Sequence, residues 1–330
     1  MAKADGTPIP LTATGGKQMA HPPPKKLLFL HGFGENHELL DAFALDGLRA
    51  CFGKGCKVDV IAGDHTFSAE EVREHMLPGE LREMAMAGDV SLTCWGAADR
   101  SAYKATVLEQ RTALMKPSLE HVLRHFEAQR GYDVIVGFSD GGTIAYELLA
   151  HAERLTSARL QTPLRMLAVL GAAEDAFVCS DARSWAPMAP EAALRGLKLF
   201  QAKGSTDSGF CSNVHSHIPG CKGELSGSFW MCEASNPYEF ALCASCAAKA
   251  RPGGPDADRM FANCPAKCRE RPLVQCEAGH AADPALFVRL ASQGLEVVGN
   301  ATWAGGHRLP GAGERMWHHL AQFYAGRLGR

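Results

Sequence analysis

Short apolar runs alternate with longer stretches of helical periodicity along most of the chain. Runs bounded by polar or glycine-rich segments predict strands, and apolar residues spaced three or four apart predict amphipathic helices. Strands are expected over 25–30, 57–62, 134–136, 164–171, 197–202 and 295–298. Helices are expected over 37–51, 105–129, 283–294 and 313–327, with another directly after residue 141. This alternation predicts an α/β fold, a mainly parallel sheet with helices on both faces.

Three segments fall outside this pattern. Residues 1–24 are polar and rich in glycine and proline, and they lack the apolar core of a signal peptide. We expect them to form a flexible leader of a cytoplasmic protein, whose cysteines are reduced or metal-bound. Residues 63–104 are expected to be irregular and to wall or cover a pocket. Residues 208–280 are rich in cysteine and histidine and are interpreted as an insertion into the main domain, which would comprise 25–207 and 281–330.

Charge and hydropathy narrow the classes of function. The chain has 330 residues and a formal net charge of −2, so no basic surplus indicates nucleic-acid binding. The longest apolar runs are shorter than a bilayer span, so no membrane span is expected.

The most informative motif is Gly137-Phe138-Ser139-Asp140-Gly141, which is G-x-S-x-G. It follows an apolar run and precedes a helical pattern, as in the nucleophile elbow of an α/β-hydrolase. The tight turn requires small residues beside the serine. The alternative is an ordinary β–α turn that contains a serine, and the strand before the motif and the helix after it favour the elbow. Ser139 is therefore the predicted nucleophile.

The remaining catalytic groups are expected in the chain order serine, acid, histidine, each after a strand. His307 follows the last strand in a glycine-rich turn and is the predicted base. Asp207 follows the strand over 197–202 and is the preferred acid, while Asp283, which precedes a helix, stays open as its rival. The oxyanion donors are expected to be the backbone amides of Phe33 and Asp140. His31, in the same loop as Phe33, is expected to hold backbone geometry by hydrogen bonding.

Four stretches together resemble the FSH family of serine hydrolases, a branch of the α/β-hydrolases. They are 27–36 (LLFLHGFGEN), 132–142 (YDVIVGFSDGG), 198–207 (KLFQAKGSTD) and 303–310 (WAGGHRLP). The resemblance implies hydrolysis of carboxylic esters or thioesters without a catalytic cofactor, and it carries the family's triad onto Ser139, Asp207 and His307. The chain departs from the family at Asp140, where many relatives have glutamine, and in the insertion directly after Asp207.

The insertion holds eight of the chain's 12 cysteines, between Cys211 and Cys276. Zinc is bound by thiolates and imidazoles, often in pairs two to four residues apart, and Cys243-x2-Cys246 is such a pair. The stretch 228–246 resembles C1- or ZZ-type zinc modules, although Ser235 stands where a further cysteine is expected. A unit of this size needs metal to fold, so one or two structural zinc ions are predicted. The candidate ligands are His215, His217, Cys221, Cys232, Cys243, Cys246, Cys264, Cys268, Cys276 and His280.

These patterns predict a serine hydrolase that cleaves carboxylic esters or thioesters through an acyl-enzyme. Lactone or peptide cleavage by the same residues stays open. The alternative is an interaction protein rather than an enzyme, in which a weakly active hydrolase scaffold carries a zinc module that binds a partner protein. For the insertion itself, disulfides or free thiols in place of zinc also stay open.

Overall fold

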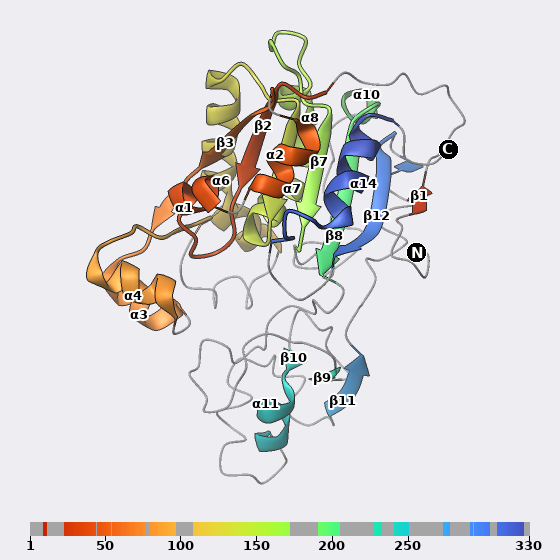
Figure 1. Cartoon of the computed structure of the whole chain (residues 1–330). Helices are drawn as coiled ribbons and strands as arrows, with labels where there is room; N and C mark the ends of the chain where they lie inside the picture. Colours follow the sequence, from red (N-terminus) through yellow and green to blue (C-terminus); the bar gives the residue numbers. More distant parts are fainter. Residues whose placement is uncertain are drawn as a thin grey trace.

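The computed structural model describes residues 9–11, 23–43, 45–53, 55–76, 79–96, 108–171, 191–204, 228–232, 241–250, 273–277, 291–292, 294–303 and 309–326. A seven-stranded sheet in the order β1-β12-β8-β7-β6-β2-β3 forms the centre of the fold (Figure 1). All its neighbouring strands run parallel except β1 and β12. The strands are β1 (Ile9–Leu11), β2 (Lys26–Leu30), β3 (Lys57–Ile61), β6 (Val134–Phe138), β7 (Met166–Leu170), β8 (Lys198–Gly204) and β12 (Glu296–Trp303).

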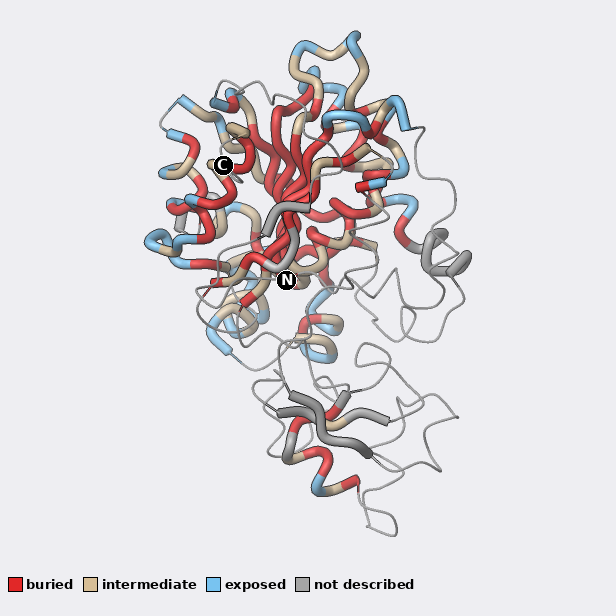
Figure 2. The backbone as a smooth tube through the Cα atoms, turned by 90° about the vertical axis from the view of Figure 1, so that its right-hand side faces the viewer, coloured by how far each residue is buried: buried red, intermediate tan, exposed pale blue. Residues whose placement is uncertain are grey.

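Both faces of the sheet are covered by helices, which explains why the central strands are continuous apolar runs. In β2, Leu27 and Phe29 join the hydrophobic cluster on one face, while Leu28 and Leu30 join the cluster on the other. Burial is concentrated on these strands (Figure 2). One face is covered by α1 (His37–Phe43), α2 (Asp46–Phe52) and α14 (Arg315–Tyr324). The other is covered by α6 (Leu108–Ala128), α7 (Asp140–Glu147), η1 (Leu148–His151), α8 (Ala152–Leu155) and α10 (Glu191–Leu194).

This architecture is the α/β-hydrolase fold, so the predicted fold class is confirmed. No helix in the described ranges is long and apolar enough to cross a membrane.

Residues 63–104, expected to be irregular, contain regular elements, so that prediction was wrong. The elements are β4 (His65–Thr66), α3 (Ala69–His75), α4 (Glu80–Ala87) and β5 (Thr93–Cys94). A capping box starts α3, because Ser68 and Glu71 each accept a hydrogen bond from the other's backbone amide. The two helices enclose a small apolar cluster of their own, formed around Phe67 and Val72.

The segment expected to be a flexible leader includes β1, which pairs antiparallel with β12 at the edge of the sheet. Pro10 lies within this strand, and an edge strand tolerates proline because one side of its backbone needs no partner. The strand β12 is longer than the expected 295–298, since it continues past an irregularity between Val298 and Ala301. The helix expected over 37–51 is split into α1 and α2.

Part of the cysteine-rich insertion forms a separate three-stranded sheet in the order β10-β9-β11. Its elements are β9 (Ser228–Cys232), β10 (Ala241–Leu242), α11 (Ala244–Lys249) and β11 (Leu273–Glu277). They lie apart from the main sheet, on the side toward which the arrows of its parallel strands point (Figure 1).

Candidate active site

The turn between β6 and α7 holds Ser139 in an unusual backbone conformation. Its φ of 52° and ψ of −116° make it one of two described non-glycine residues with positive φ, the other being Arg130. Such a conformation costs on the order of 1–3 kcal/mol and is found most often at functional sites. Two hydrogen bonds hold it: the Ser139 amide donates to the Leu170 carbonyl at 2.9 Å, and the Ser139 carbonyl accepts from the Thr143 amide at 3.1 Å. The turn therefore has the backbone form of a nucleophile elbow.

The two glycines that flank the serine are required by close packing of the backbone. A Cβ on Gly137 would collide with the Gly141 carbonyl, and a Cβ on Gly141 would collide with the carbonyls of Leu30 and His31. The start of α7 thus lies directly against the end of β2. This contact brings the loop after β2 to the serine.

Helix α7 begins at Asp140, so Ser139 is its N-cap residue. The first amides of a helix lack partners within the helix, and its dipole favours negative charge at this end. An anion that forms on the serine side of the turn would therefore be stabilised. The half-buried carboxylate of Asp140 adds a negative charge at the same helix end.

The loop after β2 covers the serine, as the parallel register predicts. Leu30 pairs with Gly137 across β2 and β6, so Gly32 comes beside Ser139 two residues later. A Cβ built on Gly32 would lie 3.3 Å from the Ser139 Cβ. The Gly32 amide donates to Oε2 of Glu35 at 2.5 Å, which closes the loop on itself. Phe33, whose amide is the predicted oxyanion donor, follows in this loop.

The imidazole of His31 anchors the same loop to the neighbouring strands. It is fully buried; its Nδ1–H donates to the Gly32 carbonyl at 2.6 Å, and its Nε2 accepts from the Gly63 amide at 2.9 Å. The Thr93 hydroxyl also contacts Nε2 at 2.9 Å. Burial lowers the pKa of His31 to about 4, so the ring is neutral near pH 7. The expectation that His31 holds backbone geometry is confirmed.

The α3–α4 segment supports the loop from outside, and the hydrophobic pattern of the sequence did not predict it. The Phe33 ring packs edge-on against Phe67 at 5.2 Å between centroids, and Met76 lies where a Cβ on Gly34 would be. The motif Ser68-x-x-Glu71 was the available signal, since a serine followed three residues later by glutamate marks a helix start.

The predicted acid and base lie outside the described residues, as does Asp283. Strand β8 ends at Gly204, three residues before Asp207, and β12 ends at Trp303, four residues before His307. Both strands run parallel to β6 through the chain of neighbours β6-β7-β8-β12. The chain therefore leaves both strands at the edge of the sheet where Ser139 lies.

The predicted zinc ligands are described only in part. Cys232 ends β9, Cys276 lies in β11, and Cys243 and Cys246 are buried at the start of α11. Within the described ranges, no group of three or more His, Cys, Asp or Glu side chains is arranged to hold a metal ion. The ligands outside those ranges are His215, His217, Cys221, Cys264, Cys268 and His280.

Two solved structures are similar to this chain over most of its length. A carboxylesterase from Bacillus cereus is 15% identical to this chain, with a TM-score of 0.39. The alignment covers 94% of this chain and 92% of the carboxylesterase. SOBER1 from Arabidopsis thaliana is 10% identical, with a TM-score of 0.43, and the alignment covers 92% of this chain and 99% of SOBER1. No curated protein matches the chain. Over residues 19–181, which hold the elbow and the loop above it, the chain matches the family model described as serine hydrolase (FSH1).

Proposed function

We propose that the protein is a serine hydrolase that cleaves carboxylic esters or thioesters, with Ser139 as nucleophile. One observation carries the proposal: Ser139 sits at positive φ on a turn that two glycines make possible, between the start of α7 and the loop after β2. An ordinary β–α turn requires neither the strained backbone nor the close approach of this loop. The match to the serine hydrolase (FSH1) family model over residues 19–181 also supports it.

In the proposed mechanism, His307 removes the proton from the Ser139 hydroxyl while its oxygen attacks the carbonyl carbon of the substrate. The carbonyl π electrons move onto oxygen, and this oxyanion accepts hydrogen bonds from the amides of Phe33 and Asp140. His307 then protonates the departing alcohol or thiol, which leaves an acyl-enzyme. Water, deprotonated by the same histidine, releases the acid and restores Ser139. Asp207 orients the imidazole and stabilises its charged form.

A fluorophosphonate probe tests the nucleophile directly, because it reacts with activated serines. Labelling of the wild type and its loss in Ser139→Ala are expected. Ser157→Ala is the matched control, since Ser157 lies in the loop that leads into the amino end of β7 and only caps a backbone amide. Labelling that persists in Ser139→Ala would reject the assignment.

The acid is tested by comparing two variants. Asp207→Asn should lower kcat by about 10⁴-fold, the size seen when a triad acid is removed, while Asp283→Asn should have little effect. The reverse result would assign the acid to Asp283. His307→Gln should abolish turnover in either case.

We also propose that residues 208–280 bind structural zinc. Cys243 is 6% exposed and Cys246 is fully buried, at the start of the short helix α11. Buried cysteines two residues apart are suitable donors for a structural zinc site. Metal analysis of the purified chain should find zinc, and Cys243→Ser or Cys246→Ser should lower the amount bound. Cys51→Ser, in α2, should not, and a metal-free wild type would reject the proposal.

A further inference from the structure

The side chain of Glu35 folds back over the loop that follows β2. Its Oε2 accepts the hydrogen bond from the Gly32 amide at 2.5 Å. A Cβ built on Gly32 would lie 3.2 Å from this oxygen and 3.3 Å from the Ser139 Cβ. A single point is thus close to both side chains. The Glu35 carboxylate therefore lies in the immediate surroundings of the proposed nucleophile, across Gly32.

The backbone of Glu35 is fixed to β5, so its side chain starts from a fixed place. Glu35 and Thr93 form an isolated antiparallel bridge. The Thr93 amide donates to the Glu35 carbonyl at 3.1 Å, and the Gly34 amide donates to the Thr93 carbonyl at 3.0 Å. The next residue, Asn36, is buried, and its side-chain amide donates to the Ser91 carbonyl at 2.9 Å. These bonds hold the loop where the Glu35 carboxylate reaches Gly32.

Gly32 has to be small, and for that reason its backbone has to be held by its neighbours. A Cβ at this position would be crowded by Glu35 and by Ser139. Glycine has more backbone freedom than any other residue, so it does not fix the direction of the chain by itself. The Glu35 carboxylate holds its amide, and the Nδ1–H of His31 donates to its carbonyl at 2.6 Å. Because the Gly32 carbonyl shares a planar peptide unit with the Phe33 amide, these two bonds set the direction of that amide.

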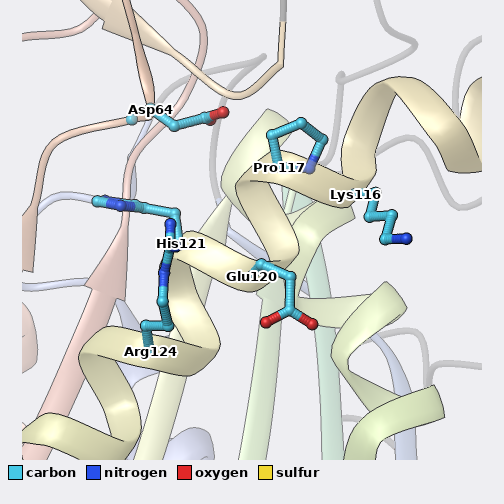
Figure 3. Close-up of a pocket in the computed structure, with 7 residues that line it drawn as sticks. Asp64, Lys116, Pro117, Glu120, His121 and Arg124 are labelled. Carbon is cyan, nitrogen blue, oxygen red and sulfur yellow. The ribbon is translucent and has the colours of Figure 1, made fainter.

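His31 is itself held by a buried network on the side of Gly32 that faces away from Ser139. The Trp95 indole N–H donates to the His31 carbonyl at 2.7 Å, and the Gly63 amide donates to the His31 Nε2 at 2.9 Å. His31, Trp95 and Gly63 are all buried. Gly63 also lines the pocket beside α6 (Figure 3). The strand registers place Gly32 between Ser139 and Gly63, so this network supports the loop from behind.

We propose that Glu35 is a positioning residue of the esterase: its carboxylate oxygen fixes the Gly32 backbone and so keeps the Phe33 amide directed at the oxyanion. This role rests on the proposed function, with Ser139 as nucleophile. Glu35 touches no reacting atom and acts through Gly32. Its bond also engages the Gly32 amide, which leaves the amides of Phe33 and Asp140 as the oxyanion donors. The role depends on an acceptor oxygen at this reach, and not on the negative charge that the oxygen carries.

Two substitutions separate the reach of the side chain from its charge. Glu35→Gln keeps an acceptor oxygen at the same reach and removes the charge, whereas Glu35→Asp keeps the charge and is shorter by one methylene. With 4-nitrophenyl butyrate as substrate, Glu35→Gln should keep kcat within about threefold of the wild type, while Glu35→Asp should lower it by about 10- to 100-fold, no more than the loss of a whole oxyanion donor. KM should change little in both variants, because a bond to the oxyanion stabilises the transition state rather than the bound substrate.

The matched control is Glu38→Asp, since Glu38 is an exposed glutamate in the first turn of α1. It should leave kcat unchanged. Wild-type activity in Glu35→Asp, or an equal loss in Glu35→Gln and Glu35→Asp, would overturn the role of Glu35 while leaving the esterase proposal intact.

The Gly32 amide gives a readout that does not depend on turnover. In NMR spectra of the chain with isotopically labelled glycine, the bond to a carboxylate at 2.5 Å should place the Gly32 amide proton far downfield and slow its exchange with water. The proton should move further upfield in Glu35→Asp than in Glu35→Gln, and the other glycine signals report whether each variant is folded. An unchanged Gly32 signal in Glu35→Asp would overturn the proposal even if no ester is hydrolysed. A wild type that neither hydrolyses esters nor reacts with a fluorophosphonate would reject the esterase proposal, and this role with it.

Discussion

Protonation of His31 should weaken the hydrogen bonds that hold the loop after β2 beside Ser139. The buried ring is neutral, and its Nε2 accepts from the Gly63 amide at 2.9 Å with the Thr93 hydroxyl at the same distance. A proton on Nε2 would make this nitrogen a donor. It could then no longer accept the hydrogen bond from the Gly63 amide, and two donors would face each other. Gly32, which contacts Ser139, is held by the other ring nitrogen.

The size of the effect follows from the pKa of His31, which burial lowers from 6.5 to about 4. A tenfold change in proton affinity corresponds to about 1.4 kcal/mol, so the neutral ring contributes up to about 3 kcal/mol to the free energy of unfolding. In the unfolded chain, His31 binds a proton once the pH falls below 6.5, whereas in the folded chain it does so only near pH 4. The contribution is therefore complete above pH 6.5 and is lost as the pH falls, by about 2 kcal/mol at pH 5.

Urea unfolding between about pH 7 and pH 5 measures this loss. The free energy of unfolding should fall by about 2 kcal/mol more in the wild type than in His31→Gln, which cannot titrate. The variant itself should be less stable at neutral pH, because it leaves buried donors without their acceptor. His318→Gln is the control, since His318 is exposed on α14, and it should keep the pH dependence of the wild type. Parallel curves for the wild type and His31→Gln would refute the reasoning.

Three further substitutions test the turn at Ser139 and the attachment of α14 to the sheet. Gly137→Ala should destabilise the protein by about 3 kcal/mol and abolish probe labelling, because the added Cβ collides with backbone; a normal melting temperature with full labelling would contradict this. Asp140→Asn should raise kcat/KM by up to about tenfold, because it removes a negative charge beside the forming oxyanion, and should lower stability slightly at the start of α7; an unchanged kcat/KM would show that the carboxylate does not act on the oxyanion. Lys198→Met should lower the free energy of unfolding by about 2–3 kcal/mol, since the buried ammonium donates to two carbonyls at the end of α14, at 2.8 and 3.2 Å. Thermal unfolding measures this loss, and exposed Lys25→Met should leave stability unchanged.

Much of the fold could be predicted because its signals are local. The apolar runs that became β2, β3, β6, β7 and β8 were located to within two residues, and α6 to within three. The turn at Ser139 was also predicted, since its glycines and serine are adjacent in the chain. Prediction failed where the hydrophobic pattern was weak. Helices α3 and α4 have only short apolar faces, and β1 forms a strand by pairing with β12, far away in the sequence.

The sequence by itself determined that strands and helices alternate, that they enclose an apolar centre, and that a serine stands on a tight turn. These properties depend on residues within a few positions of one another. Only the tertiary structure decided that β2 lies between β3 and β6, and so that Gly32 meets Ser139 while Gly63 meets His31. The low pKa of His31 arises from its burial among these same neighbours. The physical reason is that burial and electrostatic environment belong to groups brought together across the sheet, and no local pattern specifies which groups those are.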